Sequence, residues 1–185
     1  MKLFDLQERV AIVTGGNGGI GLAMGQGMAQ AGAAVVVAAR DPVKGEAAVT
    51  ALESLGVRSA FIALDVRDEA SCVNLIETVV ADFGRVDVLV NNAGTNDRKQ
   101  PEEYALAEWQ AIIDTNLTSA FMLSQRVYPV MKNAGGGKII NIGSMMSIFG
   151  ASFTVPYAAS KGGIVQMTKG MACAWAKDNI QVNAV

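Results

Sequence analysis

Short apolar runs rich in β-branched residues alternate along this chain with longer segments of helical spacing. The runs span residues 9–14, 33–39, 59–64, 86–91, 137–144 and 180–185. Each has the length and composition of a buried strand. The helical segments between them span residues 18–32, 42–56, 68–84 and 106–135, and each ends at a glycine. Strands that are apolar on both faces and separated by helices predict an α/β fold, a doubly wound parallel sheet flanked by helices on both faces.

The composition fits a single domain over residues 1–185. Hydrophobic residues make up 51% of the chain and charged residues 17%, and the sequence contains no linker, repeat or low-complexity stretch. The net charge of −2, without a face rich in Lys and Arg, argues against nucleic acid as a partner. Because we find neither a signal peptide nor a run of about 18 apolar residues, we expect no membrane association and a cytoplasmic location.

The chain contains no histidine. This removes the Ser-His-Asp, Cys-His and two-His zinc schemes from consideration. Cys72 and Cys173 lie far apart, so we expect no protein metal site and interpret both as buried small residues in a reducing compartment. If the protein moves protons, a different side chain must carry them.

A glycine-rich stretch, TGGNGGIG at residues 14–21, lies between the first predicted strand and the first predicted helix. Glycines there permit a tight turn and let backbone N–H groups reach a pyrophosphate at the helix N-terminus. The stretch lacks the Gly-Lys-Ser/Thr ending of a nucleoside-triphosphate loop, which favours a dinucleotide over ATP. The alternative is that the glycines serve only a tight turn. We predict cofactor binding by Thr14, Gly15, Asn17, Gly19, Ile20 and Gly21.

The end of the second predicted strand bears on the choice of cofactor. A dinucleotide fold usually places an acid there for the ribose 2′-hydroxyl, whereas an arginine suits a 2′-phosphate. Ala39 stands where the acid is expected, and Arg40 follows it. We therefore favour NADP(H) and keep NAD(H) as possible, because Asp41 could partly neutralise Arg40 or serve only as a helix N-cap.

Six short motifs follow one another along the chain: TGGNGGIG, LDV at 64–66, NNAG at 91–94, TN at 115–116, IGS at 142–144 and YAASK at 157–161. Together they resemble the short-chain dehydrogenase/reductase family over nearly the whole sequence. The resemblance implies a Rossmann sheet, a nicotinamide cofactor, a homotetramer and a proton relay. The relay residues that it implies are Asn116, Ser144, Tyr157 and Lys161, of which Tyr157 and Lys161 also bind the cofactor.

The same resemblance implies the rest of the cofactor pocket. Asp65 and Val66 receive the adenine, and Asn92, Ala93 and Gly94 line the pocket. Asp65 has an alternative role as an acid at the start of the helix that follows it, which is an ordinary position for aspartate.

Tyr157 and Lys161 stand one helical turn apart, which suits acid–base chemistry. Hydride transfer to a carbonyl leaves an alkoxide that must receive a proton, and a phenol can supply it. A nearby ammonium favours the phenolate needed in the reverse direction. By resemblance, Lys161 also bonds the nicotinamide ribose, Ser144 holds the substrate oxygen and Asn116 keeps a water. Taken one at a time, these residues could equally serve packing or a solvated surface.

The segment after NNAG, TNDRKQPEEY, bears on the substrate. Arg98 and Lys99 could approach a ligand at the carboxyl ends of the strands, where they would suit a carboxylate, although they could also be solvated loop charges. NDRKQPEEY and GSMMS resemble family members that act on sugar acids, such as gluconate 5-dehydrogenases and 2-deoxygluconate 3-dehydrogenases. Members that act on 3-oxoacyl thioesters or glucose are neighbouring possibilities.

The chain ends at DNIQVNAV, where family members continue. We expect a sixth strand that has barely formed, and a truncated fold without the last strand and the substrate lid. We therefore predict an oxidoreductase that interconverts a secondary alcohol and a ketone. The alternative is a catalytically weak nucleotide-binding or interaction module.

Overall fold

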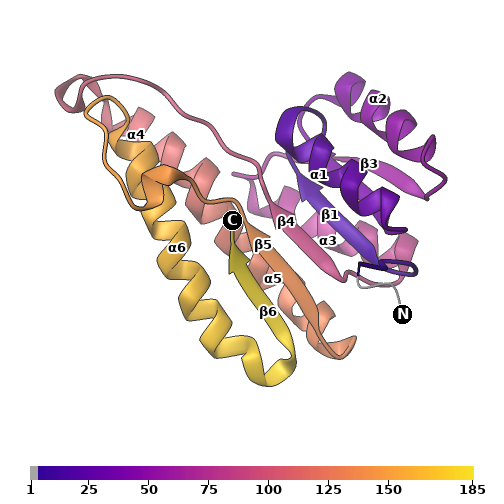
Figure 1. Cartoon of the computed structure of the whole chain (residues 1–185). Coiled ribbons are helices and arrows are strands. Elements are labelled where there is room, and N and C mark those ends of the chain that lie inside the picture. Colours follow the sequence, from indigo (N-terminus) through magenta and orange to yellow (C-terminus); the bar gives the residue numbers. More distant parts are fainter. Residues whose placement is uncertain (1–3) are drawn as a thin grey trace.

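The computed structural model describes residues 4–185 (Figure 1). The strands are β1 (Val10–Thr14), β2 (Ala34–Ala39), β3 (Ser59–Ala63), β4 (Val88–Asn91), β5 (Gly137–Asn141) and β6 (Ile180–Ala184). The α-helices are α1 (Gly19–Gln30), α2 (Pro42–Glu53), α3 (Glu69–Phe83), α4 (Leu106–Ile113), α5 (Ser119–Asn133) and α6 (Val155–Trp175). Three short 3₁₀ helices are η1 (Pro101–Glu103), η3 (Met145–Ser147) and η4 (Ala176–Asp178), and η2 (Asp114–Thr118) is a π-helix.

The six strands form one parallel sheet in the order β3-β2-β1-β4-β5-β6. Each of the six apolar runs contains one strand, so the predicted α/β class and doubly wound parallel sheet are confirmed. The strand order reverses next to β1, because β2 lies on one side of it and β4 on the other. Open α/β sheets bind their ligands beyond the carboxyl ends of the strands at such a switch point.

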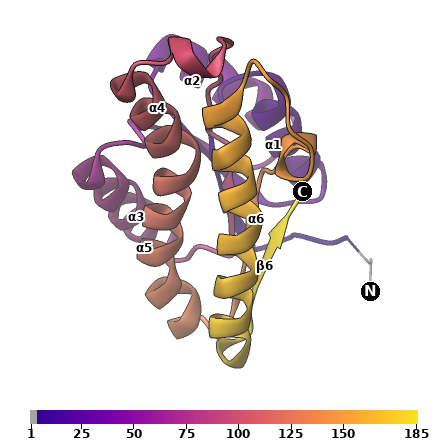
Figure 2. The same ribbon diagram turned by 90° about the vertical axis from the view of Figure 1, so that its left-hand side faces the viewer.

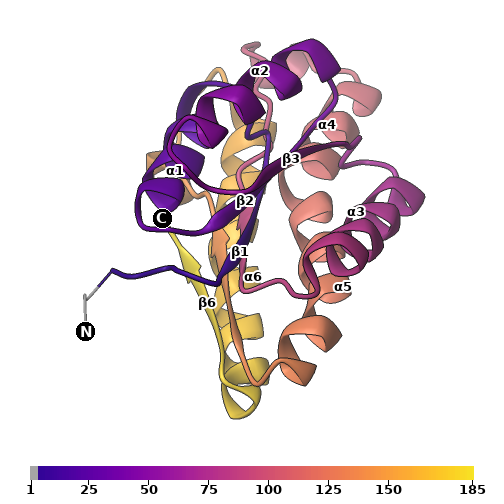
Figure 3. The same cartoon turned by 90° about the vertical axis from the view of Figure 1, so that its right-hand side faces the viewer.

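Two apolar layers cover the sheet, one on each face. Figure 3 shows α1 and α2 on one side and α3 and α5 on the other. Ile12, Leu89 and Ile139 alternate with Val13 and Val90 between the two faces, and all five are almost fully buried. Seen from the other side, α6 lies beside α5 and in front of β6 (Figure 2). Within residues 4–185, no helix is both long enough and apolar enough to cross a membrane.

Local sequence signals fix the ends of several helices. Asp41 and Asp68 are the N-caps of α2 and α3, because their carboxylates accept hydrogen bonds from Lys44 N and Ala70 N. Gly84 ends α3 in the left-handed conformation, with φ of 77°, as the sequence predicts for a helix C-terminus. The N-cap role is one of the two that we considered for Asp41.

Three expectations differ from the structure. The segment predicted as one helix over 106–135 is two helices joined by the π-turn of η2, which breaks the 3.6-residue period around Asn116. The sixth strand is fully formed, because all five residues of β6 pair with β5 from Gly137↔Ile180 onward. Cys72 is buried as expected, but Cys173 is exposed on α6.

Candidate active site

The glycine loop joins β1 to α1 at the middle of the carboxyl edge of the sheet. Gly15 has a φ of 63°, a conformation that side chains rarely adopt. A methyl group at Gly21 would overlap the Gly15 carbonyl and lie 2.5 Å from Asn92 Nδ2. Around Gly18 and Gly19 a methyl group would meet no atom within 4 Å, so the loop is open on that side. The glycines are therefore needed both for the tight turn and for the packing beneath it.

Thr14 and Asn92 join the ends of β1 and β4 under this loop. The Thr14 hydroxyl accepts hydrogen bonds from the backbone N–H groups of Asn92 and Ala93, each at 3.0 Å, and donates to the Val90 carbonyl. The Asn92 amide donates in return to the carbonyls of Thr14 and Gly15, at 2.9 and 3.2 Å. These two predicted cofactor residues thus hold the walls of the switch point in place without lining the cavity above it.

A cavity of about 850 Å³ lies above the loop. Seven of the predicted cofactor residues line it, namely Gly15, Asn17, Arg40, Asp65, Val66, Ala93 and Gly94. Thr14, Gly19, Ile20, Gly21, Asn92, Tyr157 and Lys161 do not, and Ile20 is largely exposed to solvent. The sequence missed Gly18, Ala38, Ala39, Asp41, Lys44, Leu64, Arg67, Thr95, Ala111 and Thr115, which also line the cavity.

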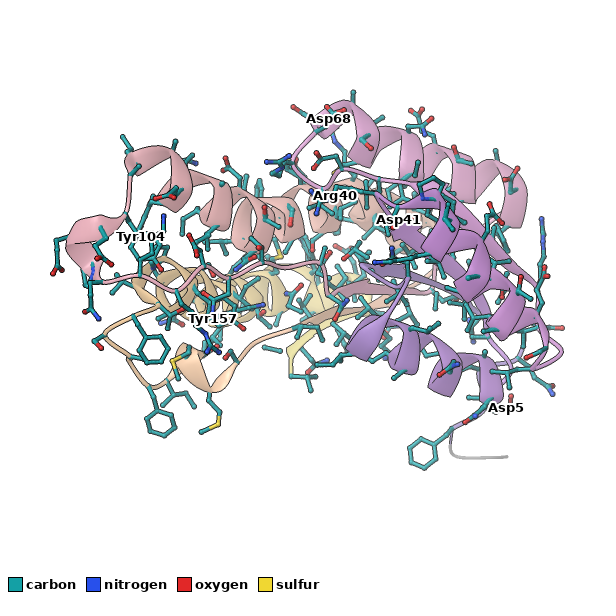
Figure 4. All side chains as sticks on the ribbon, turned by 90° about the horizontal axis from the view of Figure 1, so that it is seen from above. Asp5, Arg40, Asp41, Asp68, Tyr104 and Tyr157 are labelled. Carbon is teal, nitrogen blue, oxygen red and sulfur yellow. The ribbon has the colours of Figure 1, made fainter. Side chains whose placement is uncertain are left out.

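Basic side chains gather in the part of this cavity formed by the ends of β2 and β3. Arg40 and Lys44 line it, and Lys44 lies 3.9 Å from the Asp41 carboxylate, so Asp41 pairs with Lys44 as well as capping α2. The Arg67 guanidinium donates to both oxygens of Asp65 and holds the pKa of that carboxyl below its usual value. Figure 4 looks onto the carboxyl edge of the sheet, where Arg40 and Asp41 lie close together and Tyr157 lies away from them.

A second cavity of about 320 Å³ adjoins the loop that follows β4. It is lined by Asn96, Arg98, Ser144, Met146, Ala151, Phe153, Thr154 and Tyr157. Gly94 and Thr95 line the larger cavity, and the next residue, Asn96, lines the smaller one. The two cavities therefore lie next to each other along the loop that follows β4. The smaller cavity brings together the predicted substrate residue Arg98 and the predicted catalytic residues Ser144 and Tyr157.

Lys161 lies beneath Tyr157 on the first turns of α6. Its side chain is only 4% exposed, and its ammonium donates to the Ile142 carbonyl at 2.6 Å. The ammonium also lies 5.6 Å from the centre of the Tyr157 ring. Within residues 4–185 no carboxylate pairs with it, and burial lowers the pKa of Lys161 below its ordinary value. The structure therefore sets an unpaired positive charge next to a phenol.

Asn116 is buried in the π-turn η2 and faces the loop after β4. Its amide oxygen accepts from Thr95 N at 2.8 Å, and its NH₂ group donates to the Thr95 carbonyl at 2.8 Å and to Ser160 Oγ at 3.1 Å. Asn116 therefore fixes the backbone of Thr95 between the two cavities. Ser144 lies at the start of η3, where its hydroxyl accepts from Met146 N.

Arg98 and Lys99 are neighbours in sequence but differ in their surroundings. The Lys99 ammonium pairs with Glu108 and, at 3.5 Å, with Asp97, and Lys99 does not line the smaller cavity. Arg98 does line it, and within residues 4–185 its guanidinium forms no salt bridge or hydrogen bond. Of the two predicted substrate residues, only Arg98 presents an unpaired charge to the cavity.

The larger cavity suits an elongated dinucleotide. It runs from the open glycine loop past Arg40 and Asp65 to the segment Ala93–Thr95, so one end offers backbone N–H groups and another offers basic side chains. These are the groups that bind a diphosphate and a ribose phosphate. The described residues contain no group of three or more His, Cys, Asp and Glu side chains placed to hold a metal ion.

Comparison with known protein families gives one match over almost the whole chain. Residues 9–185 match the model for short chain dehydrogenases. The chain belongs to the short-chain dehydrogenase family. The resemblance seen in the sequence is thereby confirmed, and with it the assignment to the NAD(P)-dependent oxidoreductases of this family.

Individual relatives and solved structures of dehydrogenases are similar to this chain over nearly its whole length. The 2-dehydro-3-deoxy-D-gluconate 5-dehydrogenase of Formosa agariphila is 37% identical over the full chain, which spans 70% of that relative. The structure of a gluconate 5-dehydrogenase from Burkholderia cenocepacia, in complex with NADP and tartrate, has a TM-score of 0.93 and 36% identity, covering 98% of this chain and 71% of that one. An NAD⁺-bound xylitol dehydrogenase has a TM-score of 0.94 and 31% identity, covering 97% and 69%.

Proposed function

We propose that this dehydrogenase interconverts a secondary alcohol and a ketone on a sugar acid, with NADP(H) preferred over NAD(H). The observation that carries the proposal is the smaller cavity, where Arg98, Ser144 and Tyr157 meet beside the dinucleotide cavity. An acid-binding cation and a hydroxyl pair in one small cavity match a substrate with a carboxylate and a carbonyl. The relatives named for gluconate and 2-dehydro-3-deoxygluconate support this substrate class.

The preference for NADP(H) rests on the charges around Arg40. Ala39 removes the acid that would hold a ribose 2′-hydroxyl, and Arg40 and Lys44 line the same part of the cavity. Asp41 is the N-cap of α2 and pairs with Lys44, and among the described residues it forms no ion pair with Arg40. A 2′-phosphate would meet two cations there, whereas a 2′-hydroxyl would lack the acid that is usual at the position of Ala39.

In the mechanism that we propose, the chain holds the cofactor along the larger cavity and performs the proton transfer in the smaller one. When bound, the nicotinamide supplies or accepts the hydride. The Ser144 hydroxyl donates a hydrogen bond to the substrate oxygen, and the Tyr157 phenol gives that oxygen its proton during reduction and takes it back during oxidation. The Lys161 ammonium stabilises the phenolate, and its burial without a carboxylate leaves that charge unneutralised.

Asn116 and Arg98 have supporting roles in this mechanism, one in positioning the loop and the other in binding the substrate. Asn116 positions Thr95 between the cavities through two hydrogen bonds, and a third, to Ser160 Oγ, holds Asn116 itself. Arg98 binds the substrate carboxylate, for which its planar guanidinium is suited. Lys99 has no such role in the proposal, because Glu108 and Asp97 occupy its ammonium.

Turnover of gluconate with NADP⁺ tests the function, with Tyr157→Phe as the decisive variant. Loss of a general acid–base group is expected to lower the rate about 10²- to 10⁴-fold. Binding of NADPH should be unchanged. Tyr128→Phe is the matched control, because the Tyr128 hydroxyl donates to Asp178 at the far end of α6. A Tyr157→Phe variant as active as wild type would contradict the relay. Cofactor binding without any turnover would favour the nucleotide-binding module instead.

We also propose a homotetramer in the cytoplasm. The family resemblance supports the tetramer, and the two free cysteines support a reducing compartment. Sedimentation of the purified chain tests the assembly, and a monomer at all concentrations would contradict it.

A further inference from the structure

Hydrogen bonds hold the loop that follows β4 both before and after Arg98 in the sequence. Thr95 is held by Asn116, and the Asp97 carbonyl accepts from the Tyr104 hydroxyl at 2.6 Å. Lys99 N donates to the Phe153 carbonyl at 3.1 Å, which ties the loop to the segment before α6. Within residues 4–185 the Arg98 backbone N–H donates to Asp97 Oδ1 at 2.9 Å, whereas the Arg98 guanidinium forms no hydrogen bond or salt bridge and lies over the Phe153 ring, 5.7 Å from its centre. The loop is thus ordered around one side chain that is left available.

Thr154 supplies a further attachment in an unusual way. It is the N-cap of α6, a position where a threonine hydroxyl ordinarily accepts a hydrogen bond from the first turn of its own helix. Here it makes no such bond, although its carbonyl begins the helix by accepting from Ala158 N. Its hydroxyl instead donates to Asn96 Oδ1 at 2.7 Å. Thr154 is 3% exposed, so the donor side of this bond is shielded from water, whereas Asn96 is exposed.

The bond also determines what Asn96 can offer to a ligand. Asn96 lines the smaller cavity, and its amide oxygen is taken by Thr154. The amide NH₂ group remains, and within residues 4–185 it makes no hydrogen bond. NH₂ and guanidinium groups are both donors only. Asn96 and Arg98 therefore present donors to the cavity, which suits the acceptor oxygens of a carboxylate.

We propose that the Thr154 hydroxyl is a positioning group for the acidic end of the substrate, acting by fixing Asn96 and with it the loop that carries Arg98. Thr154 stands three residues before Tyr157, so the bond sets the distance between the loop and the helix that holds the proton donor. This inference rests on the proposed sugar-acid function. It assigns a specificity role to a buried hydroxyl outside the relay.

Calorimetric titration with gluconate and with glucitol, at saturating NADPH, tests the proposal, because the reduced cofactor cannot oxidise an alcohol and the heat then reports binding alone. Glucitol has a similar chain of hydroxyl groups but no carboxylate. Thr154→Val removes the hydroxyl at nearly constant volume and should weaken gluconate binding about fivefold, the effect of one lost hydrogen bond. Thr154→Ser should restore wild-type affinity. Glucitol and NADPH should bind all three proteins equally, which a general loss of structure would not permit.

Asn96→Ala provides a second route, because Asn96 is exposed and its replacement should not disturb folding. It should weaken gluconate binding at least as much as Thr154→Val, because it removes both the bond to Thr154 and the NH₂ donor, and adding Thr154→Val to it should have no further effect. A readout without substrate is amide hydrogen exchange, which should become faster over residues 95–100 in Thr154→Val but not in Thr154→Ser.

The outcomes separate this inference from the proposed function. If Arg98→Ala weakens gluconate binding but Thr154→Val does not, the positioning role is wrong and the substrate class stands. If Thr154→Val weakens gluconate and glucitol equally, the hydroxyl has only a structural role. If wild type binds gluconate no better than glucitol, the sugar-acid function itself fails.

Discussion

Replacing Lys161 by methionine should make the folded protein more stable. The Lys161 ammonium is almost fully buried, has one hydrogen bond to the Ile142 carbonyl and has no carboxylate partner among residues 4–185. Removing an ammonium from water costs several kcal/mol even after relaxation. A charged hydrogen bond returns about 1.5–3 kcal/mol. Methionine fills a similar volume, but it has no charge to desolvate and does not form the hydrogen bond. Because the desolvation cost is the larger of the two, Lys161→Met should raise the free energy of unfolding by about 1–3 kcal/mol at pH 7.

The pH dependence follows from the lowered pKa of Lys161. Between this lowered pKa and the unfolded value near ~10.4, the unfolded chain binds more protons than the folded protein. The stability contributed by this group therefore rises with pH through that window, because the buried charge disappears. The advantage of Lys161→Met should then shrink as the pH approaches 10. Other titrating groups cancel when wild type and variant are compared at the same pH.

Thermal unfolding at pH 7 and pH 10 measures both effects. For a chain of this length a gain of about 2 kcal/mol corresponds to roughly 4–8 °C in Tm. Lys169→Met is the matched control, because Lys169 is exposed on the same helix and should change Tm little. A Lys161→Met variant that is less stable than wild type at pH 7, or whose advantage is the same at both pH values, would refute the reasoning. The expected result would mean that Lys161 is kept for its charge beside Tyr157 and not for stability.

Other predictions concern the cofactor cavity and the thiols. Arg40→Ala should lower the ratio of NADPH affinity to NADH affinity about tenfold, because a charged hydrogen bond to the phosphate is lost. Calorimetry with both cofactors measures this ratio, and an unchanged ratio would contradict the prediction. Gly21→Ala should weaken binding of either cofactor at least about tenfold, since the added methyl lies 2.5 Å from Asn92 Nδ2, whereas Gly27→Ala, with open space around it, should not. At pH 8 a chromogenic disulfide should titrate one thiol in the native protein, exposed Cys173, because Cys72 is buried and burial raises the pKa of its thiol to about 11; two reactive thiols would count against the packing of α3.

The fold was predictable because its signals are local. Each strand is a short apolar run, and Asp68 and Gly84 mark the ends of α3 in ways that depend only on backbone geometry. The π-turn around Asn116 was missed, since an inserted residue changes the helical period without a residue type that announces it. We also expected β6 to be barely formed, whereas all of it pairs with β5. This pairing could not be seen locally, because the partner strand lies about 40 residues away in the sequence.

The site was predictable where a motif fixes the backbone and unpredictable where side chains meet across the fold. The glycine loop, Asp65 and Ala93 line the cavity as expected. Lys44 and Arg67 were missed, because only the folded chain shows that they reach the same cavity as Arg40. Likewise, adjacent Arg98 and Lys99 look equivalent in sequence, and their difference arises from a pairing with Glu108 nine residues further on.

Calorimetric titration of this chain with NADPH and, separately, with NADH addresses the cofactor cavity itself. The proposed function predicts that both bind and that NADPH binds more tightly, because Arg40 and Lys44 line the cavity where a 2′-phosphate would lie and Ala39 replaces the acid that usually holds a 2′-hydroxyl. Tighter binding of NADH, or no binding of either cofactor, would contradict it.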